Sequence, residues 1–259
     1  MEIGMNQAAI NKKILSYSGK TDTLVETSKP VVNEHSAALI VNGQHWLTFI
    51  CSPTDLEALA LGFLYGENVI DDPAEVQAIT LEDNASRIVV NLSHQADKPT
   101  HFHRTSTGYG LDKQLNPPNL PNDFHVSPAQ VLDLYRMFLD QQELHEHVGG
   151  FHSAGLSDGI SVPIMVEDVG RHNCVDKLTG LFLLKGRPFV PRLLLLSGRI
   201  SSEMVFKTFA LGIPLIVSRT SPTALAVERA WEAGITLIGY LRGSQFDIYS
   251  HPERLRTEG

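Results

Sequence analysis

The protein has 259 residues, 42% of them hydrophobic and 19% charged, which fits one large or two modest domains with a sizeable core. Its formal net charge is −8, and the absence of a lysine- and arginine-rich block argues against nucleic-acid binding. Two cysteines, Cys51 and Cys174, are too few for a disulfide framework or a cysteine-based zinc site.

The N-terminal part predicts a small α+β domain. Residues 1–35 are polar and mixed, and indicate a loose arm; they lack the apolar core of a signal peptide. Apolar runs on both sides of Asn42-Gly43 predict a hairpin. Residues 52–55 predict the start of a helix capped by a hydroxyl or carboxylate, and two more strands are expected in 78–92. We assign residues 1–110 to this domain.

Residues 111–259 are assigned to a second domain of the α/β class. A polar, histidine-rich stretch at 93–110 and the prolines that follow it indicate the inter-domain segment, and a helix is expected at 129–145. The remainder alternates between strands rich in leucine, isoleucine and valine and amphipathic helices, which predicts a mostly parallel sheet. The expected strands are 164–169, 193–197, 215–218, 235–240 and 246–249, and the expected helices are 173–184, 201–211 and 223–233.

Three strand-to-helix junctions of this domain carry an arginine beside small or hydroxyl residues. The residues concerned are Arg171 and His172, Ser197 and Arg199, and Ser218 and Arg219. Helix N-termini attract anions, and such junctions lie at one edge of an open α/β sheet. We therefore expect a phosphorylated or nucleotide-like ligand. The alternative is that the hydroxyls are simple helix caps and the arginines pair with local carboxylates.

Two histidines are candidate acids or bases. His152 follows Gly149-Gly150, where the backbone conformations open to glycine would let a ligand approach the chain closely. The alternative is an exposed histidine in a glycine-rich turn. His172 lies four residues before Asp176, a spacing that can hold an imidazole in one orientation. Glu167 and Asp168 are interpreted as a solvated rim.

Cys174 is expected in the first helical turn, where a helix N-terminus can lower a thiol pKa, but its neighbours give no further activation and inert packing is the favoured interpretation. Cys51 is interpreted as inert. The zinc signatures of hydrolases and deaminases are missing, so we expect no metal site. The longest apolar runs are far shorter than a membrane span, so we expect a cytoplasmic protein without membrane contact.

Five segments in order resemble the FdhD/NarQ family of formate dehydrogenase accessory sulfurtransferases. They occupy residues 56–70, 149–155, 167–177, 196–205 and 218–243. The resemblance implies a cytidine-deaminase-like α/β/α fold without zinc. It also implies a persulfide carrier that takes sulfur from a cysteine desulfurase and passes it to the molybdenum bis(molybdopterin guanine dinucleotide) cofactor before insertion into formate dehydrogenase.

The resemblance further implies a homodimer, and guanine nucleotides as analogues of the cofactor. It assigns one late loop to that ligand, namely Tyr240, Leu241, Arg242, Gly243, Ser244 and Gln245.

One departure from the family is chemical. Thr107 stands where the persulfide-forming cysteine is expected, and Gly110 stands where the second cysteine is expected. Sulfur exchange takes place at a sulfur atom, so a threonine cannot carry it. We therefore predict retained cofactor binding and doubtful sulfur transfer. The alternatives are a sulfurtransferase using Cys174 or Cys51, a nucleotide-acting enzyme using His152 or His172, and a purely regulatory module.

Overall fold

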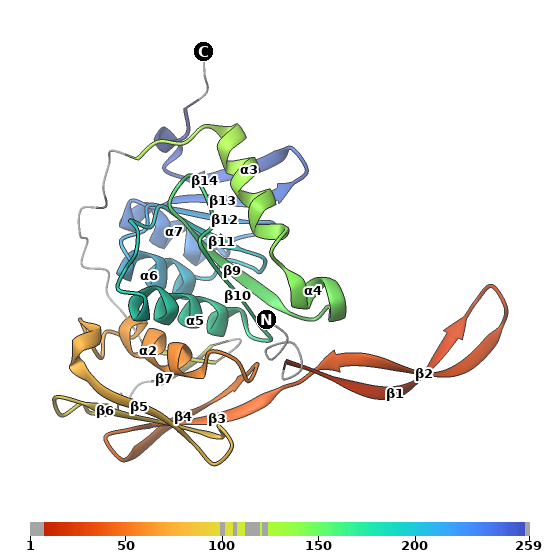
Figure 1. The fold of residues 1–259 in the computed structure, drawn as a ribbon. Coiled ribbons are helices and arrows are strands. Elements are labelled where there is room, and N and C mark those ends of the chain that lie inside the picture. Colours follow the sequence, from red (N-terminus) through yellow and green to blue (C-terminus); the bar gives the residue numbers. More distant parts are fainter. Residues whose placement is uncertain (1–7, 99–101, 106–107, 112–119, 121–123, 257–259) are drawn as a thin grey trace.

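The computed structural model describes residues 8–98, 102–105, 108–111, 120 and 124–256. A small unit with a four-stranded sheet packs against a larger unit with a six-stranded sheet, and a long hairpin extends from the body (Figure 1). The α/β class is confirmed. The boundary predicted between residues 110 and 111 stays a prediction, because residues 112–119 lie outside the described part of the chain.

The small unit contains the predicted hairpin and helix. Its strands, in the order β4-β3-β6-β5, are β3 (His35–Val41), β4 (Gln44–Cys51), β5 (Val76–Glu82) and β6 (Arg87–Leu92). Asn42 and Gly43 have φ of +48° and +80°, as a tight hairpin turn requires. Helix α2 (Leu56–Gly66) follows, and a short 3₁₀ turn η1 (Pro73–Glu75) precedes β5. The prediction that a side chain caps this helix is wrong, because the N-cap Asp55 has a left-handed backbone conformation and its side chain accepts no capping hydrogen bond.

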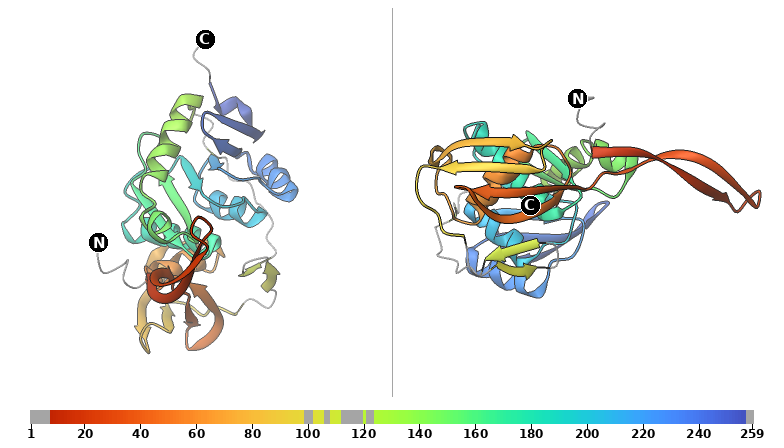
Figure 2. Two further views of the ribbon diagram at one scale, coloured as in Figure 1. Left: turned by 90° about the vertical axis from the view of Figure 1, so that its right-hand side faces the viewer. Right: turned by 90° about the horizontal axis from the view of Figure 1, so that it is seen from below.

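The prediction of a loose N-terminal arm is also wrong. Strands β1 (Ala9–Ser18) and β2 (Thr23–Val32) form a continuous antiparallel ladder from the pair Ala9–Val32 to the pair Ser18–Thr23. Figures 1 and 2 show this β1–β2 arm extending away from the body. Polar residues on both faces concealed the strand pattern, since period-two alternation is clear only where one face is buried.

The larger unit has the strand order β10-β9-β11-β12-β13-β14. Its strands are β9 (His152–Ser157), β10 (Ile164–Asp168), β11 (Leu193–Leu196), β12 (Leu215–Ser218), β13 (Thr236–Arg242) and β14 (Gln245–Ser250). The expectation of a mostly parallel sheet is wrong, because only β11–β12 and β12–β13 pair in parallel. Strand β9 was not predicted, since His152–Ser157 lacks β-branched residues and contains a glycine.

Helices cover both faces of this sheet (Figure 1). Helices α5 (Arg171–Leu184), α6 (Ser202–Ala210) and α7 (Ala224–Ala233) share one apolar core with the sheet. Helix α3 (Pro128–Leu139) packs on the opposite face. The helix expected at 129–145 is in fact two, because α3 ends before Asp140 and α4 (Glu143–Val148) begins separately.

Two shorter elements complete the described chain. Strands β7 (Phe102–Thr105) and β8 (Gly108–Leu111) pair with each other inside the segment predicted to join the domains. A 3₁₀ turn, η2 (Pro252–Arg254), follows β14. No helix within the described ranges is long and apolar enough to cross a membrane.

The two units meet where α2 crosses α5. A Cβ atom added at Gly62 would lie 1.8 Å from the backbone oxygen of Asp176, and one added at Gly180 would lie 1.9 Å from that of Ala58. The two helix backbones are therefore in direct contact, which only glycine allows. Beside this contact, the buried Lys207 ammonium pairs with the carboxylates of Asp176 and Glu67.

Replacing Gly180 with alanine tests this contact. Alanine favours a helix over glycine by about 1 kcal/mol, but its methyl group would force the two backbones apart. We expect a net loss of about 2 kcal/mol in the free energy of unfolding, measured by denaturant titration. The control is Gly66→Ala, where the nearest atom to a new Cβ is the flexible Lys207 ammonium at 3.4 Å. Equal stability of the two variants would contradict the close packing.

Candidate anion-binding site

The predicted junctions meet at one edge of the six-stranded sheet. Strands β11, β12 and β13 are parallel, so their carboxyl ends share that edge. Strand β9 is antiparallel to β11 and begins there with His152, which pairs with Asp168 at the end of β10. The residues brought to this edge are Arg171, His172, Ser197, Arg199, Ser218 and Arg219. The convergence expected from the sequence is therefore found.

The hydroxyl groups of the junctions hold the edge together. Ser218 Oγ donates to the Gly198 carbonyl at 2.7 Å and accepts from the Thr220 amide at 3.1 Å. Ser197 Oγ accepts from the Ser153 amide at 2.8 Å. These two serines fix neighbouring junctions to one another and do not cap the helices. Thr223 is the hydroxyl that caps a helix, accepting from the Ala226 amide.

Tyr135 of α3 supports the same edge from the face of the sheet that α3 covers. Its hydroxyl donates to the Leu196 carbonyl at 2.8 Å and accepts from the Arg219 amide at 3.2 Å. Burial raises the pKa of Tyr135 well above its usual value, partly offset by the Arg219 contact, so this hydroxyl stays protonated at neutral pH. It therefore spans the first turns after β11 and β12.

The arginines leave positive charge at this edge. Arg199 and Arg219 are exposed, and neither forms an ion pair with a residue that the structure describes. Arg171 is half-buried, and its pKa is lowered first by burial and then by the charge of Arg199. Two guanidinium groups thus lie near each other. Cations placed together in this way are stabilised by an anionic ligand.

The environment of His172 differs from the prediction. Its Nε2 lies 2.7 Å from Glu203 Oε2 and 3.3 Å from Ser201 Oγ, both at the start of α6. The Asp176 carboxylate, which the spacing suggested as its partner, forms an ion pair with Lys207; burial raises the pKa of Asp176, and the charges of Lys207 and His172 oppose that rise. His172 therefore joins the junctions after β10 and β11.

His152 faces the centre of the edge. A Cβ atom at Gly198 would lie 3.1 Å from its Nδ1, so the imidazole packs on the backbone of the junction after β11. Burial lowers the pKa of His152, and the charge of Arg171 lowers it further. The ring is therefore neutral near pH 7, and one nitrogen can donate while the other accepts.

The segment assigned by resemblance to a loop is a tight hairpin. Tyr240, Leu241 and Arg242 end strand β13, Gly243 and Ser244 make the turn, and Gln245 begins β14. Leu241 is buried in the core, whereas Arg242, Gly243, Ser244 and Gln245 are exposed. Tyr240 has φ of +50° and donates its amide to the Thr220 carbonyl, which places the hairpin beside the junction after β12. Tyr240 is 41% exposed, and the Arg242 guanidinium carbon lies 5.5 Å from its ring centroid.

Neither cysteine is an activated thiol. Cys174 and Cys51 are both fully buried, and Cys174 Sγ donates to the His152 carbonyl at 3.3 Å. Burial, followed by the charge of Asp168, raises the pKa of Cys174 well above its usual value and that of Cys51 to about 12. Inert packing, the interpretation favoured for Cys174 from the sequence, is therefore confirmed, because burial outweighs the effect of the helix N-terminus on its pKa. Thr107 lies outside the described residues, and Gly110 pairs with His103 in the β7–β8 ladder.

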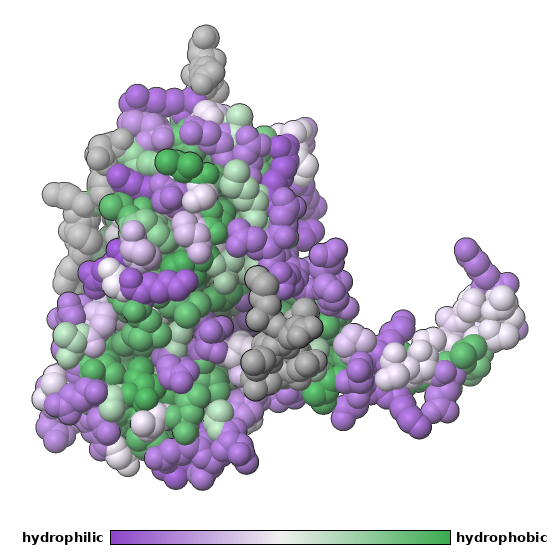
Figure 3. All heavy atoms as spheres, viewed as in Figure 1, coloured by the Kyte–Doolittle hydropathy of each residue, from purple (hydrophilic) through white to green (hydrophobic). Residues whose placement is uncertain are grey.

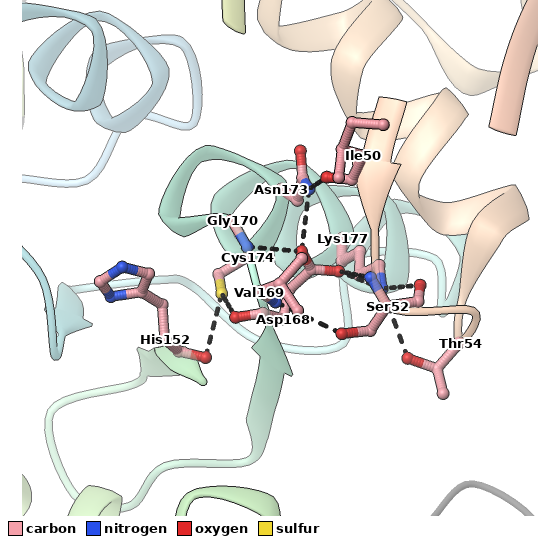
Figure 4. Close-up of polar contacts among 10 residues, drawn as sticks. All are labelled: Ile50, Ser52, Thr54, His152, Asp168, Val169, Gly170, Asn173, Cys174 and Lys177. Carbon is pink, nitrogen blue, oxygen red and sulfur yellow. Dashed lines mark hydrogen bonds and ion pairs between the residues drawn. The ribbon is translucent and has the colours of Figure 1, made fainter. Parts of the chain in front are cut away.

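A buried carboxylate at this edge was missed from the sequence. Glu167 and Asp168 were interpreted as a solvated rim, but both are buried. Glu167 accepts from the amides of Leu144 and His145 at the start of α4. Asp168 forms an ion pair of 2.6 Å with Lys177, and both side chains are 0% exposed (Figure 4). The sequence signal that could have revealed this buried ion pair is Lys177 itself, a charged residue on the helix face that also carries the apolar Cys174 and Leu178.

The described residues contain no group of three or more histidine, cysteine, aspartate or glutamate side chains that could hold a metal ion. The edge is thus a cationic, hydrogen-bonding surface. Its chemistry suits binding of an anion with hydrogen-bond acceptors.

Comparison with known proteins places these features in one family. A family model described as the FdhD/NarQ family matches residues 32–256. The sulfur carrier protein FdhD of Bacillus pumilus (strain SAFR-032) is 32% identical over 261 residues, covering 97% of this chain and 99% of that protein. The sulfur carrier protein FdhD of Bacillus subtilis (strain 168) is 33% identical over 236 residues, covering 87% and 90%.

A solved structure agrees in fold. A crystal structure described as a formate dehydrogenase accessory protein from Desulfotalea psychrophila has a TM-score of 0.81 and 29% identity. The match covers 96% of this chain and 100% of that chain. Since both the family model and these relatives span most of its length, the chain belongs to the FdhD/NarQ family.

Proposed function

We propose that this chain is an accessory protein for formate dehydrogenase maturation that binds the molybdenum bis(molybdopterin guanine dinucleotide) cofactor at its arginine-bearing edge. The observation that carries the proposal is the convergence of Arg171, Arg199 and Arg219 on one sheet edge of an acidic protein. The guanine dinucleotide parts of the cofactor carry phosphates, which arginine binds through charge-assisted hydrogen bonds. The names of the relatives support the link to formate dehydrogenase.

The remaining residues of the edge would complete the ligand contacts. The neutral imidazole of His152 offers one donor and one acceptor next to Gly198. The exposed ring of Tyr240 offers a surface for an aromatic base, and Arg242 beside it adds a cation. Ser197 and Ser218 would act through the backbone that they hold, because their hydroxyls are already engaged.

Sulfur transfer is not part of the proposal. A sulfur carrier needs an accessible thiolate to attack the persulfide of a cysteine desulfurase. Cys51 and Cys174 are both fully buried with raised pKa values, and Thr107 replaces the cysteine expected in the loop. The alternative in which Cys174 carries the sulfur has no support from its environment. A cysteine desulfurase would be a partner only under that alternative, whereas the dehydrogenase apoenzyme remains a partner in both.

The β1–β2 arm supports the homodimer implied by the resemblance. Leu15, Tyr17 and Leu24 share one face near its outer end and are 67%, 63% and 66% exposed. Figure 3 shows hydrophilic, neutral and apolar side chains along the arm, and apolar side chains gathered on the body over α2 and α5. A lone two-stranded hairpin is marginally stable in water, so we infer that a second surface supports it.

Charge points to a second copy as the source of that surface. Residues 9–32 contain four lysines and two acidic residues, so the arm carries +2 on a chain of −8, and the rest carries −10. Lys12 lies directly opposite Lys29 in the ladder, a like-charge pair that an acidic surface would stabilise. The body of a second copy offers such a charge, and exchange of arms would be symmetric.

Binding of guanosine diphosphate, measured by calorimetry, tests the cofactor-binding edge. We expect the native chain to bind it, and we expect Arg199→Ala and Arg219→Ala each to raise the dissociation constant about tenfold, or about 1.4 kcal/mol. The matched control is Arg87→Ala. Arg87 lies on β6, far from the edge, and forms an ion pair with Glu82 of β5. No nucleotide binding, or equal loss in the control, would contradict the proposal.

Thiol reactivity tests the absence of sulfur transfer. Because both thiols are buried and un-ionised near pH 8, we expect a coloured disulfide reagent to label them only after denaturation. Incubation with a cysteine desulfurase and cysteine should leave both cysteines without a persulfide by mass spectrometry. A persulfide on Cys174 or Cys51 of the folded chain would establish the sulfurtransferase alternative instead.

The mass in solution, measured by light scattering, tests the arm. Leu15→Asp combined with Leu24→Asp places charges on its apolar face, and we expect a dimeric wild type to become monomeric. The control is Val190→Asp, at a residue that is 62% exposed on the body. A monomeric wild type, or a dimer that survives the change in the arm, would exclude this mode of association.

A further inference from the structure

The small unit reaches the anion-binding edge through the turn of residues 50–54, which joins β4 to α2. The Ser52 amide donates to Asp168 Oδ2 at 2.9 Å. Lys177 Nζ donates to the Ser52 carbonyl at 2.9 Å and to Thr54 Oγ1 at 3.3 Å. Figure 4 shows these groups converging from the two units on one buried carboxylate. The turn and the edge therefore share a single anchoring group.

The other carboxylate oxygen of Asp168 fixes the start of α5. Its Oδ1 accepts from the Gly170 amide and from Asn173 Nδ2, both at 2.8 Å. Gly170 is the N-cap of α5 and has no side chain to cap the helix, and Asp168 instead holds this end of the helix through the Gly170 amide and the Asn173 side chain. Arg171 and His172 follow directly. The carboxylate thus sets the direction in which these two side chains leave the backbone.

Lys177 provides the charge that this arrangement requires. A carboxylate without solvent is strongly unfavourable unless a cation and hydrogen bonds compensate it. With Lys177 at 2.6 Å and three further donors, both oxygens of Asp168 are satisfied. Asn173 adds a second link between the units, since its Nδ2 also donates to the Ile50 carbonyl at 2.7 Å.

We propose that Asp168 and Lys177 are positioning residues, which hold Arg171 and His172 for the anionic ligand and tie them to the turn of residues 50–54. Neither touches the ligand, because both side chains are 0% exposed. The inference rests on the proposed function, since it concerns the same edge. It makes the small unit part of the scaffold of the binding site.

The test is the affinity for guanosine diphosphate of a variant that removes both charges together, Asp168→Asn with Lys177→Met. Asparagine keeps the size of the side chain but turns one acceptor into a donor, which faces the Ser52 amide or the Gly170 amide. We expect the dissociation constant to rise about tenfold. Asn173→Ala is a milder change at a partly exposed residue, and should raise it about threefold.

A double-mutant cycle with Arg171→Ala separates positioning from general destabilisation. Because Asp168 acts in part through Arg171, the combined variant should lose less affinity than the sum of the two separate losses. Losses that add would overturn the inference. The control removes the buried cluster of three charges between α2, α5 and α6, by Glu67→Gln, Asp176→Asn and Lys207→Met together, and should change the affinity less than twofold.

Amide hydrogen exchange of the ligand-free protein gives an independent readout. Removal of the Asp168 pair should speed exchange at Ser52, Gly170 and Arg171, whereas the control triple variant should not. If the wild type fails to bind guanosine diphosphate, the proposed function is wrong, and exchange alone then decides the inference. Unchanged exchange at these amides would overturn it.

Discussion

A side chain on Gly62 or Gly180 would collide with the backbone of the facing helix, so α2 and α5 pack in one way. This contact sets the small unit against the helix whose first residue is Arg171. It also brings the turn of residues 50–54 to the end of β10, within reach of Asp168. The geometry of the cationic edge therefore depends on a contact between two helices that the ligand never meets.

Burial distinguishes the arginines of this structure from its cysteine thiols. The arginines at the edge keep their charge because they remain at least partly in solvent, and this is what an anion needs. The thiols lie in the core, where the low dielectric favours their neutral form. At Cys174 this burial outweighs the helix N-terminus, which on its own would lower the pKa of the thiol.

Local chemistry made much of the fold predictable from the sequence. Strands such as Leu193–Leu196 are uniformly apolar, and the turn Asn42-Gly43 demands positive φ. Strand β9 could not be predicted, because a central strand with glycine and serine is stabilised by its neighbours and not by its own residues. The placement of Arg171, Arg199 and Arg219 could be predicted, because strand-to-helix junctions share one edge of an α/β sheet. The partner of His172 could not be predicted from the sequence. Spacing favours Asp176, but only the tertiary structure shows that Lys207 occupies that carboxylate.

The segment in which this chain departs from its family lies in a separate element. Strands β7 and β8, which flank Thr107, pair with each other and not with either larger sheet in the described structure. The buried links that shape the edge run instead through Asp168, Ser197 and Ser218. None of these three links involves a residue of β7 or β8. Binding of an anion at this edge, as we propose it, would therefore not depend on β7 and β8 through any of these buried links.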